Sequence, residues 1–126
     1  MKQALVLDDS EDRNNEFRKR FLEKGISNYD ITTTADECIE ALRNETYDVI
    51  FLDHDLGGDI MVESSNHNTG YTVAKWLCDN ESHKDAIIVL HSLNVIGRHN
   101  MKDMFLKNEY HVIDHPWAWL NLPVNF

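Results

Sequence analysis

The sequence predicts one α/β domain over residues 1–126, built on a doubly wound, five-stranded parallel sheet in strand order 2-1-3-4-5. Three observations support this prediction. Short apolar runs rich in β-branched residues alternate with helical patterns, which is typical of β-α-β units. The run Val49–Leu52 is apolar at every position, as expected of a central strand covered on both faces. Finally, four apolar runs end in polar or ionisable residues, which favours a ligand site at the carboxyl ends of the strands.

The strands are expected at five apolar runs, each separated from the next by a helical segment. These runs are Gln3–Leu7, Tyr29–Thr33, Val49–Leu52, Ala86–Leu90 and Tyr110–Ile113. After Pro116 only ten residues remain, and they are aromatic and interrupted by a second proline. Because proline disrupts a helix interior, the final helix is expected to be shortened or irregular.

The first helix has signals at both of its ends. Ser10 can cap its amino end, and Gly25 is a plausible terminating glycine. Between them, the spacing of Phe17, Phe21 and Leu22 predicts an apolar face toward the core.

The other helices follow from capping and periodicity. Thr34–Glu37 has the pattern of a capping box that opens the second helix. The polar stretch 57–68 is expected to be an active-site loop, after which the third helix begins at Thr69 or Gly70. The fourth helix is expected at Arg98–Leu106. Residues expected to face inward from the second and third helices are Cys38, Ala41, Leu42, Val73, Ala74 and Leu77.

Composition excludes several classes of function. The formal net charge is −10, so the chain lacks the basic surface that binding to extended nucleic acid requires. No apolar run approaches the length of a membrane span. Cys38 and Cys78 lie far apart within helical patterns, which argues for buried packing in a reducing, cytoplasmic compartment rather than for a disulfide framework.

Acidic residues at the strand ends are candidates for a metal site. Asp8 and Asp9 follow the first strand, and Asp53 and Asp55 follow the third. In the predicted strand order these ends are neighbours, so the four carboxylates are expected to converge. Mg²⁺ prefers such oxygen ligands and often brings substrate phosphate into its coordination shell. For any one aspartate, capping of a helix or turn explains the position about equally well.

Two histidines follow the fourth and fifth strands. Because His91 and His115 would lie on the same rim as the aspartates, they are candidates for general acid and base, with Asp53 as a third catalytic candidate. Alternatively, either histidine could join the aspartates in a mixed nitrogen and oxygen site suited to Mn²⁺ or Zn²⁺. A lone histidine at a strand end is more often structural than catalytic.

Four further residues are candidates for substrate binding. Ser92 and Asn94 could bind phosphate oxygens, although both types of residue are common in turns. Arg13, one turn into the first helix, could bind a phosphate bidentately. Strand alternation predicts that His54 points away from Asp53, yet it could line the loop that follows.

Over roughly residues 2–116 the chain resembles the receiver domains of response regulators. Asp8 and Asp9 match the acidic pair of that family, Asp53 matches the phosphoacceptor, and the backbone at Asp55 matches the position that completes the metal site. His91 stands in place of the usual serine or threonine. His115 stands in place of the lysine that precedes Pro116.

Five short motifs bring the chain closer to a divergent branch, the cyclic-phosphate-processing receiver-like domains. They are Leu7–Arg13 (L-D-D-S-E-D-R), Leu52–Leu56 (L-D-H-D-L), Thr69–Tyr71 (T-G-Y), His91–Asn94 (H-S-L-N) and His99–Met101 (H-N-M). The resemblance implies a flavodoxin-like fold and the processing of a cyclic phosphate on a nucleotide or RNA end.

The leading hypothesis is therefore a metal-assisted phosphoesterase that opens a cyclic phosphodiester, with Mg²⁺ or Mn²⁺ as the expected cation and Zn²⁺ as a further candidate. A small nucleotide or RNA end is the expected partner. Two alternatives stay open. One is a signalling receiver phosphorylated at Asp53, and the other is a non-catalytic module that binds a cyclic nucleotide.

Overall fold

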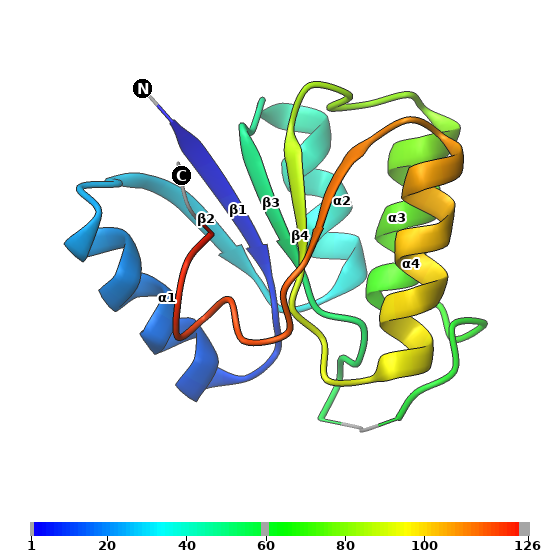
Figure 1. Ribbon diagram of the computed structural model, residues 1–126, viewed down its shortest axis with the longest axis horizontal. Helices are drawn as coiled ribbons and strands as arrows, with labels where there is room; N and C mark the ends of the chain where they lie inside the picture. Colours follow the sequence, from blue (N-terminus) through cyan, green and yellow to red (C-terminus); the bar gives the residue numbers. More distant parts are fainter. Residues whose placement is uncertain (1, 59–60, 124–126) are drawn as a thin grey trace.

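The computed structural model describes residues 2–58 and 61–123. Its centre is a five-stranded parallel sheet in the order β2-β1-β3-β4-β5, which confirms the predicted fold class and strand order (Figure 1). The strands are β1 (Gln3–Leu7), β2 (Asn28–Thr32), β3 (Val49–Leu52), β4 (Ile87–Leu90) and β5 (His111–Asp114).

Helices cover both faces of the sheet. They are α1 (Glu11–Glu23), α2 (Ala35–Asn44), α3 (Gly70–Asp79) and α4 (Val95–Lys107). In Figure 1, α1 and the carboxyl-terminal segment lie on one side of the sheet, and α2, α3 and α4 lie on the other. This arrangement is the doubly wound one that alternating strand and helix signals predict.

Two hydrophobic cores result from the alternation of side chains along the strands. Leu5, Ile50 and Ile88 face α2, α3 and α4, whereas Val6 and Phe51 face α1. Since successive side chains point to opposite faces of a strand, each central strand contributes to both cores. All five of these residues are fully buried, as the apolar runs predict.

The carboxyl-terminal segment takes the place of a fifth helix. Residues 116–120 form turns, in agreement with the predicted irregular ending. Ala118 and Leu122 are buried in the same core as Phe17, and Arg20 of α1 donates a hydrogen bond from Nε to the Leu120 carbonyl at 2.9 Å. This segment therefore closes the α1 face of the sheet.

Some local expectations need correction. Leu22 is 81% exposed, so it does not belong to the apolar face of α1; it follows Phe21 by one residue and is rotated by about 100° from it. Helix α4 begins at Val95 rather than Arg98, because Asn94 caps it by accepting a hydrogen bond from the Gly97 amide. Strands β2 and β5 are each displaced by one residue from their expected bounds, and β4 starts at Ile87 rather than Ala86.

Other local expectations are confirmed. The Ser10 side chain caps α1, α3 begins at Gly70, and Thr34 caps α2. In the capping box, the Glu37 carboxylate accepts from the Thr33 amide, one residue before the cap. Both cysteines are buried and free. In the described part of the chain, none of the helices combines the length and apolar character needed to cross a membrane.

Candidate functional site

The register of the parallel strands aligns four ionisable residues in one row. Leu7 pairs with Leu52, which pairs with Leu90. The hydrogen-bond ladder continues for one more residue: the Asp53 amide donates to the Leu7 carbonyl at 3.0 Å, and the His91 amide to the Leu52 carbonyl at 3.1 Å. In the same way, backbone hydrogen bonds of Asp8 and His115 continue the ladder for one residue beyond the ends of β1 and β5. Side chains of such a row point to the same face, which here is the face covered by α1.

Asp8 lies at the β1 end of this row and is fully buried. Arg13 binds it bidentately, with Nε donating to Oδ2 at 2.8 Å and a terminal nitrogen donating to Oδ1 at 2.9 Å. The His91 Nε2 atom lies 2.8 Å from Asp8 Oδ2, and the Ser10 amide donates to Oδ1 at 2.8 Å. Ser10, two residues after Asp8, caps the amino end of α1. Because the connection from β1 to α1 is this short, the Ser10 amide and the Arg13 side chain both reach the Asp8 carboxylate.

Two more carboxylates surround Arg13. Its terminal nitrogen lies 3.2 Å from Asp53 Oδ2 and 4.0 Å from Asp9 Oδ1. Oxygens of Asp8, Asp9 and Asp53 all lie within 4.8 Å of one another. An all-oxygen donor set of this kind fits a hard cation such as Mg²⁺ or Mn²⁺. Among the described residues, no histidine nitrogen joins the group, so it is less suited to Zn²⁺.

Asp8 and Asp53 are both buried, but their pKa values are shifted in opposite directions. Burial raises the pKa of Asp53 to about 6, and the neighbouring Asp8 carboxylate adds to this rise, while His91 and Arg13 oppose it. Burial also acts to raise the pKa of Asp8, but the hydrogen bonds from His91 and Arg13 outweigh it and bring that pKa down to about 2. Asp8 therefore stays ionised at neutral pH, whereas Asp53 is close to its titration range.

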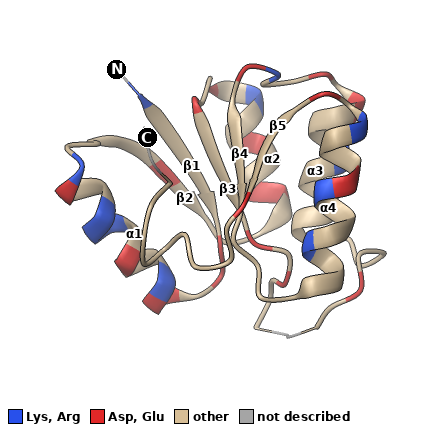
Figure 2. Ribbon diagram, in the orientation of Figure 1, with Lys and Arg blue, Asp and Glu red and all other residues tan. Residues whose placement is uncertain are grey.

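A pocket of about 440 Å³ opens over this cluster. The described residues that line it include Asp9, Arg13, Asp53 and His91. Figure 2 shows acidic segments where the chain leaves the lower ends of the strands, the edge on which the pocket opens.

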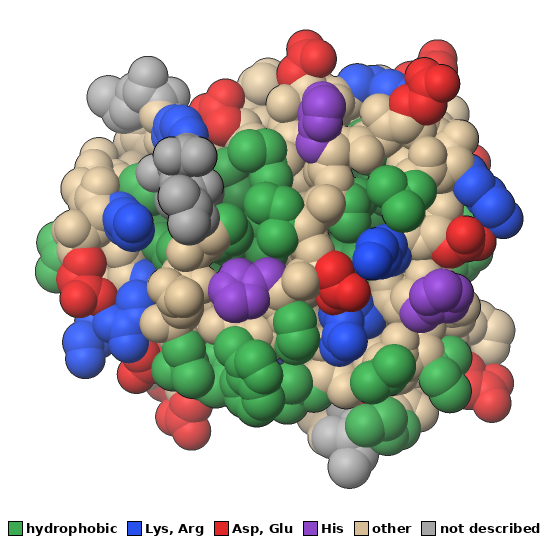
Figure 3. Space-filling view, in the orientation of Figure 1, with side chains coloured by type: hydrophobic (Ala, Val, Ile, Leu, Met, Phe, Trp, Pro, Cys, Tyr) green, Lys and Arg blue, Asp and Glu red, His purple; other side chains and the backbone are tan. Residues whose placement is uncertain are grey.

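One side of the pocket is apolar. Met61 and Leu93 line it and are 65% and 45% exposed, and the nearby Val95 and Ile96 in the first turn of α4 are exposed as well. Figure 3 shows hydrophobic side chains gathered along the lower edge of the molecule. A ligand in this pocket would meet charged groups at its floor and apolar groups at its rim.

His115 is placed differently from His91. It is half-buried, its Nε2 atom lies 2.6 Å from the Asn121 carbonyl, and it is absent from the described lining of the pocket. The row of strand ends thus brings His91 to the carboxylates, while the carboxyl-terminal segment engages His115. A catalytic role for His115 stays a prediction.

Asp55 and His54 belong to a second network beside the first. His54 is fully buried on the opposite face of the sheet from Asp53, as alternation predicts. Its Nδ1 atom lies 2.8 Å from Asp55 Oδ1, and the other Asp55 oxygen accepts from the Met61 amide at 2.7 Å. The Asp55 carboxylate is therefore directed away from the other three aspartates, although the residue still borders the pocket.

Ser92 and Asn94 are occupied by local structure. The Ser92 hydroxyl accepts from the Asn94 amide at 3.1 Å. The Asn94 side chain caps α4 and donates to Asp55 Oδ1 at 3.0 Å and to the Val62 carbonyl at 3.2 Å. Both residues line the pocket, so their predicted contact with a substrate would require exchange of these bonds.

Several residues around the site escaped prediction. The Gly58 amide donates to Asp9 Oδ2 at 2.6 Å, and Asn14 donates from Nδ2 to the Asp8 carbonyl at 2.9 Å. Gly70 lets α3 approach the end of β3, because a Cβ there would come within 1.9 Å of the Asp53 carbonyl oxygen. The glycines of the loop and the T-G-Y motif were the available signals; no sequence pattern indicated Met61 or Leu93 as pocket walls.

The sequence matches the family model of the cyclic-phosphate processing receiver domain over residues 3–107. The chain belongs to this family, whose name associates it with the processing of cyclic phosphates. No curated protein matches the sequence.

Solved structures of receiver domains share the fold. The receiver domain of the Francisella response regulator 1452 is 19% identical, with a TM-score of 0.65, and the match covers 94% of this chain and 88% of that one. The response regulator TrrA of Thermotoga maritima, solved in complex with Mg²⁺ and BeF, is 24% identical with a TM-score of 0.61, over 94% and 90% of the two chains. A Burkholderia pseudomallei response regulator with a phosphorylated aspartic acid and a calcium ion is 19% identical with a TM-score of 0.64, over 97% and 68%.

Proposed function

We propose that this domain is a metal-assisted phosphoesterase that opens a cyclic phosphate on a nucleotide or RNA end. The observation that carries the proposal is that a buried imidazole, His91, lies beside the cluster of carboxylates, with its Nε2 atom 2.8 Å from Asp8 Oδ2. A group that can donate and accept a proton would therefore lie beside a candidate cation site at the floor of a pocket. Membership of a family named for cyclic-phosphate processing supports the choice of substrate.

Arg13 is proposed to bind the phosphate. Its guanidinium is partly exposed to the pocket and already bridges Asp8 and Asp53. Phosphate oxygens accept a bidentate pair from arginine as carboxylate oxygens do. An anionic substrate would therefore draw Arg13 from Asp8 and expose the floor on which His91 lies.

His91 is proposed to transfer the proton. Its hydrogen bond to the Asp8 carboxylate holds the ring in place. His91 would donate a proton to the alkoxide that leaves when the cyclic ester opens. This step does not need His115. Substitution of each histidine therefore tests whether one or both take part in catalysis.

Asp8, Asp9 and Asp53 would hold the cation. When bound, a divalent cation supplies Lewis-acid stabilisation of the phosphoryl group and a more acidic water. The apolar rim of Met61 and Leu93 would contact the uncharged part of the substrate, such as a nucleobase.

The test is hydrolysis of 2′,3′- and 3′,5′-cyclic nucleotides in the presence of Mg²⁺, Mn²⁺ or Zn²⁺. We expect turnover to fall by at least about a hundredfold in His91→Ala, in line with the typical contribution of general acid catalysis. We expect His115→Ala to keep most of it. Full activity in His91→Ala would contradict the proposal, and equal loss in both variants would restore the two-histidine scheme. Intact cyclic nucleotide recovered after tight binding would favour the binding module.

Phosphorylation of Asp53 is a second candidate function. It is favoured by the position of Asp53 at the end of β3 in a receiver fold. Incubation with acetyl phosphate and Mg²⁺, followed by mass spectrometry of the intact protein, separates the two functions. A stable adduct that Asp53→Asn abolishes would support signalling, while turnover of a cyclic phosphate without any adduct would support the enzyme.

A further inference from the structure

The Asp8 carboxylate is saturated with hydrogen bonds, and Arg13 supplies two of them. Oδ1 accepts from the Ser10 amide at 2.8 Å and from a terminal nitrogen of Arg13 at 2.9 Å. Oδ2 accepts from Arg13 Nε at 2.8 Å and lies 2.8 Å from His91 Nε2. A carboxylate has about four lone-pair positions, so all of them are engaged here. Asp8 can therefore bind a cation only after one of these donors has left.

Of these donors, Arg13 is the one that can move away. The Ser10 amide belongs to the backbone at the cap of α1, and the His91 side chain is fully buried. The Arg13 side chain is 29% exposed and lines the pocket over the cluster. An arginine side chain rotates about several bonds, so the guanidinium can turn into the pocket while the backbone of α1 stays in place.

The same guanidinium spans all three candidate ligands of the cation. The terminal nitrogen that binds Asp8 also lies 3.2 Å from Asp53 Oδ2 and 4.0 Å from Asp9 Oδ1. These are the carboxylates whose oxygens lie within 4.8 Å of one another. Two positive groups on the same oxygens repel each other and compete for the same lone pairs. The guanidinium and a divalent cation therefore exclude each other from this cluster.

A released guanidinium would face the pocket. Among the described residues that line this pocket, Arg13 is the only lysine or arginine. A phosphate in the pocket would accept the bidentate pair that Arg13 now gives to Asp8. The cation and the phosphate thus favour the same position of Arg13, away from the carboxylates. Because each shifts Arg13 toward that position, binding of either one would strengthen binding of the other.

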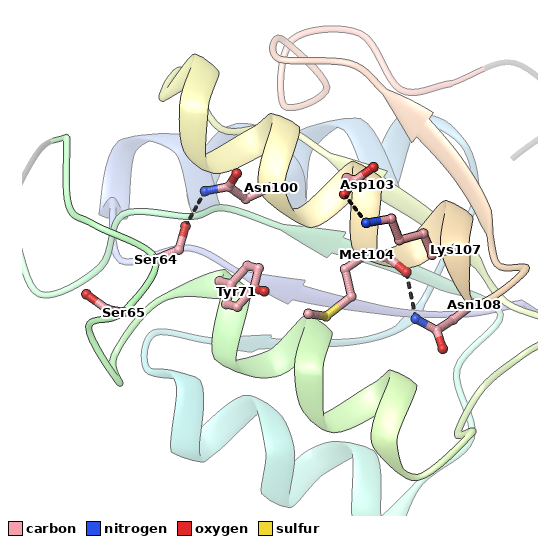
Figure 4. A pocket seen from close by; sticks show the side chains of 8 residues that line it. All are labelled: Ser64, Ser65, Tyr71, Asn100, Asp103, Met104, Lys107 and Asn108. Carbon is pink, nitrogen blue, oxygen red and sulfur yellow. Dashed lines mark hydrogen bonds and ion pairs between the residues drawn. The ribbon is translucent and has the colours of Figure 1, made fainter.

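A larger pocket of about 560 Å³, lined by residues of α3, α4 and the loop before α3, provides a control for phosphate binding. Among its described lining residues, the only lysine or arginine is Lys107. Figure 4 shows Lys107 directed toward Asp103 on the same helix, and the two form an exposed salt bridge of 3.0 Å. An effect of phosphate that depends on Arg13 and is independent of Lys107 therefore belongs to the pocket at the strand ends.

We propose that Arg13 is an internal competitor for the cation site and that it couples cation binding to phosphate binding. While it is held by Asp8 and Asp53, Arg13 closes these carboxylates to a divalent cation. When it is released, it binds the phosphate. This role of Arg13 rests on the proposed function of the pocket and explains how that site is regulated, because the phosphate binds well only together with the cation.

The first test follows Arg13 in the wild-type chain by nitrogen-15 NMR and needs no variant that might fail to fold. The Arg13 Nε–H group, bonded to Asp8, should exchange its hydrogen slowly with water. Saturation with Mg²⁺ should speed this exchange by at least about tenfold, because a charge-assisted hydrogen bond is lost. Inorganic phosphate added with Mg²⁺ should slow it again. An exchange rate that stays unchanged while Mg²⁺ binds would overturn the proposal.

The second test measures Mg²⁺ affinity by isothermal titration calorimetry. Arg13→Gln removes the competitor and should tighten binding by at least about tenfold, which is a typical size for coupling between two ligands. Arg18→Gln removes the same charge from the exposed surface of α1 and should bind Mg²⁺ as the wild type does. The difference should persist in about 0.5 M KCl, which screens distant charges. An unchanged affinity in folded Arg13→Gln, or a difference that vanishes at high salt, would contradict the proposal.

The third test repeats the titration in saturating inorganic phosphate. Phosphate should tighten Mg²⁺ binding in the wild type and equally in Lys107→Gln, whereas Arg13→Gln should lose most of this effect. An equal effect in Arg13→Gln would overturn the coupling. Failure of the inference is distinct from failure of the proposed function. Mg²⁺ binding that is indifferent to Arg13 overturns the inference alone, whereas absence of Mg²⁺ binding in both wild type and Arg13→Gln removes the cation site and overturns both.

Discussion

The His91 imidazole and the Asp8 carboxylate form a fully buried pair, with Nε2 and Oδ2 separated by 2.8 Å. The pair spans the sheet from β4 to β1, across the intervening β3. In the polar row at the strand ends, it connects the acidic cluster to an imidazole, the group proposed to transfer the proton. Arg13 completes the cluster from α1, so four side chains from three strands and one helix meet at a single point.

Arg13 is predicted to be required for stability because it neutralises buried carboxylates. Arg13→Gln should lower the free energy of unfolding by about 3 kcal/mol at pH 7 in buffer without divalent cations, since two buried charges lose their partner. Urea unfolding of wild type and variant measures the difference. Arg18→Gln, an exposed change on the same helix, is the control and should cost under about 0.5 kcal/mol. Equal stabilities of Arg13→Gln and wild type would contradict the assignment.

Asp53 is predicted to destabilise the folded protein near neutral pH. Its pKa is raised from 3.8 to about 6 in the folded state, so its favourable contribution is fully present below pH 3.8 and is lost as the pH rises through about 6. Asp53→Asn should therefore raise the free energy of unfolding at pH 8, by at most about 3 kcal/mol at 1.4 kcal/mol per pKa unit. The gain should shrink as the pH falls toward 4. Unfolding curves at several pH values check this, and a gain that is constant with pH would argue against it.

A divalent cation is predicted to stabilise the protein through Asp8, Asp9 and Asp53. Binding to the folded state alone adds about 2.7 kcal/mol at a cation concentration one hundred times the Kd. Mg²⁺ should raise the Tm of the wild type, and Asp9→Asn should reduce this rise. Asp55→Asn is the matched control: its carboxylate lies in the other network, so the rise should persist. Loss of the cation effect in Asp55→Asn would place Asp55 among the ligands.

Asn94 is predicted to contribute more than a helix cap. Asn94→Ala removes the cap of α4 together with bonds to Asp55 and the Val62 carbonyl, and should cost about 2–3 kcal/mol of stability. Thr34→Ala removes the cap of α2 alone and should cost about 1 kcal/mol. Thermal unfolding of both variants makes the comparison, and equal costs would show that the network around Asp55 adds nothing.

Much of the site could be predicted because it depends on strand order. Asp8, Asp53 and His91 each follow an apolar run directly, and the parallel register brings those ends together. The roles of Asp55 and His115 could not be predicted in this way. Each lies at the expected strand end, but the direction of its side chain depends on partners from distant segments: Met61 and Asn94 for Asp55, and Asn121 for His115.

The sequence by itself determined the order of the strands, the two cores and the convergence of acidic residues at one edge, because period-2 alternation and apolar runs are local properties of the chain. Only the tertiary structure decided how those residues divide between two networks. It placed Arg13 among the carboxylates and joined His54 to Ser64, ten residues further along the chain. Such contacts depend on the path of a loop and the packing of α4 at Gly97, which no local pattern encodes.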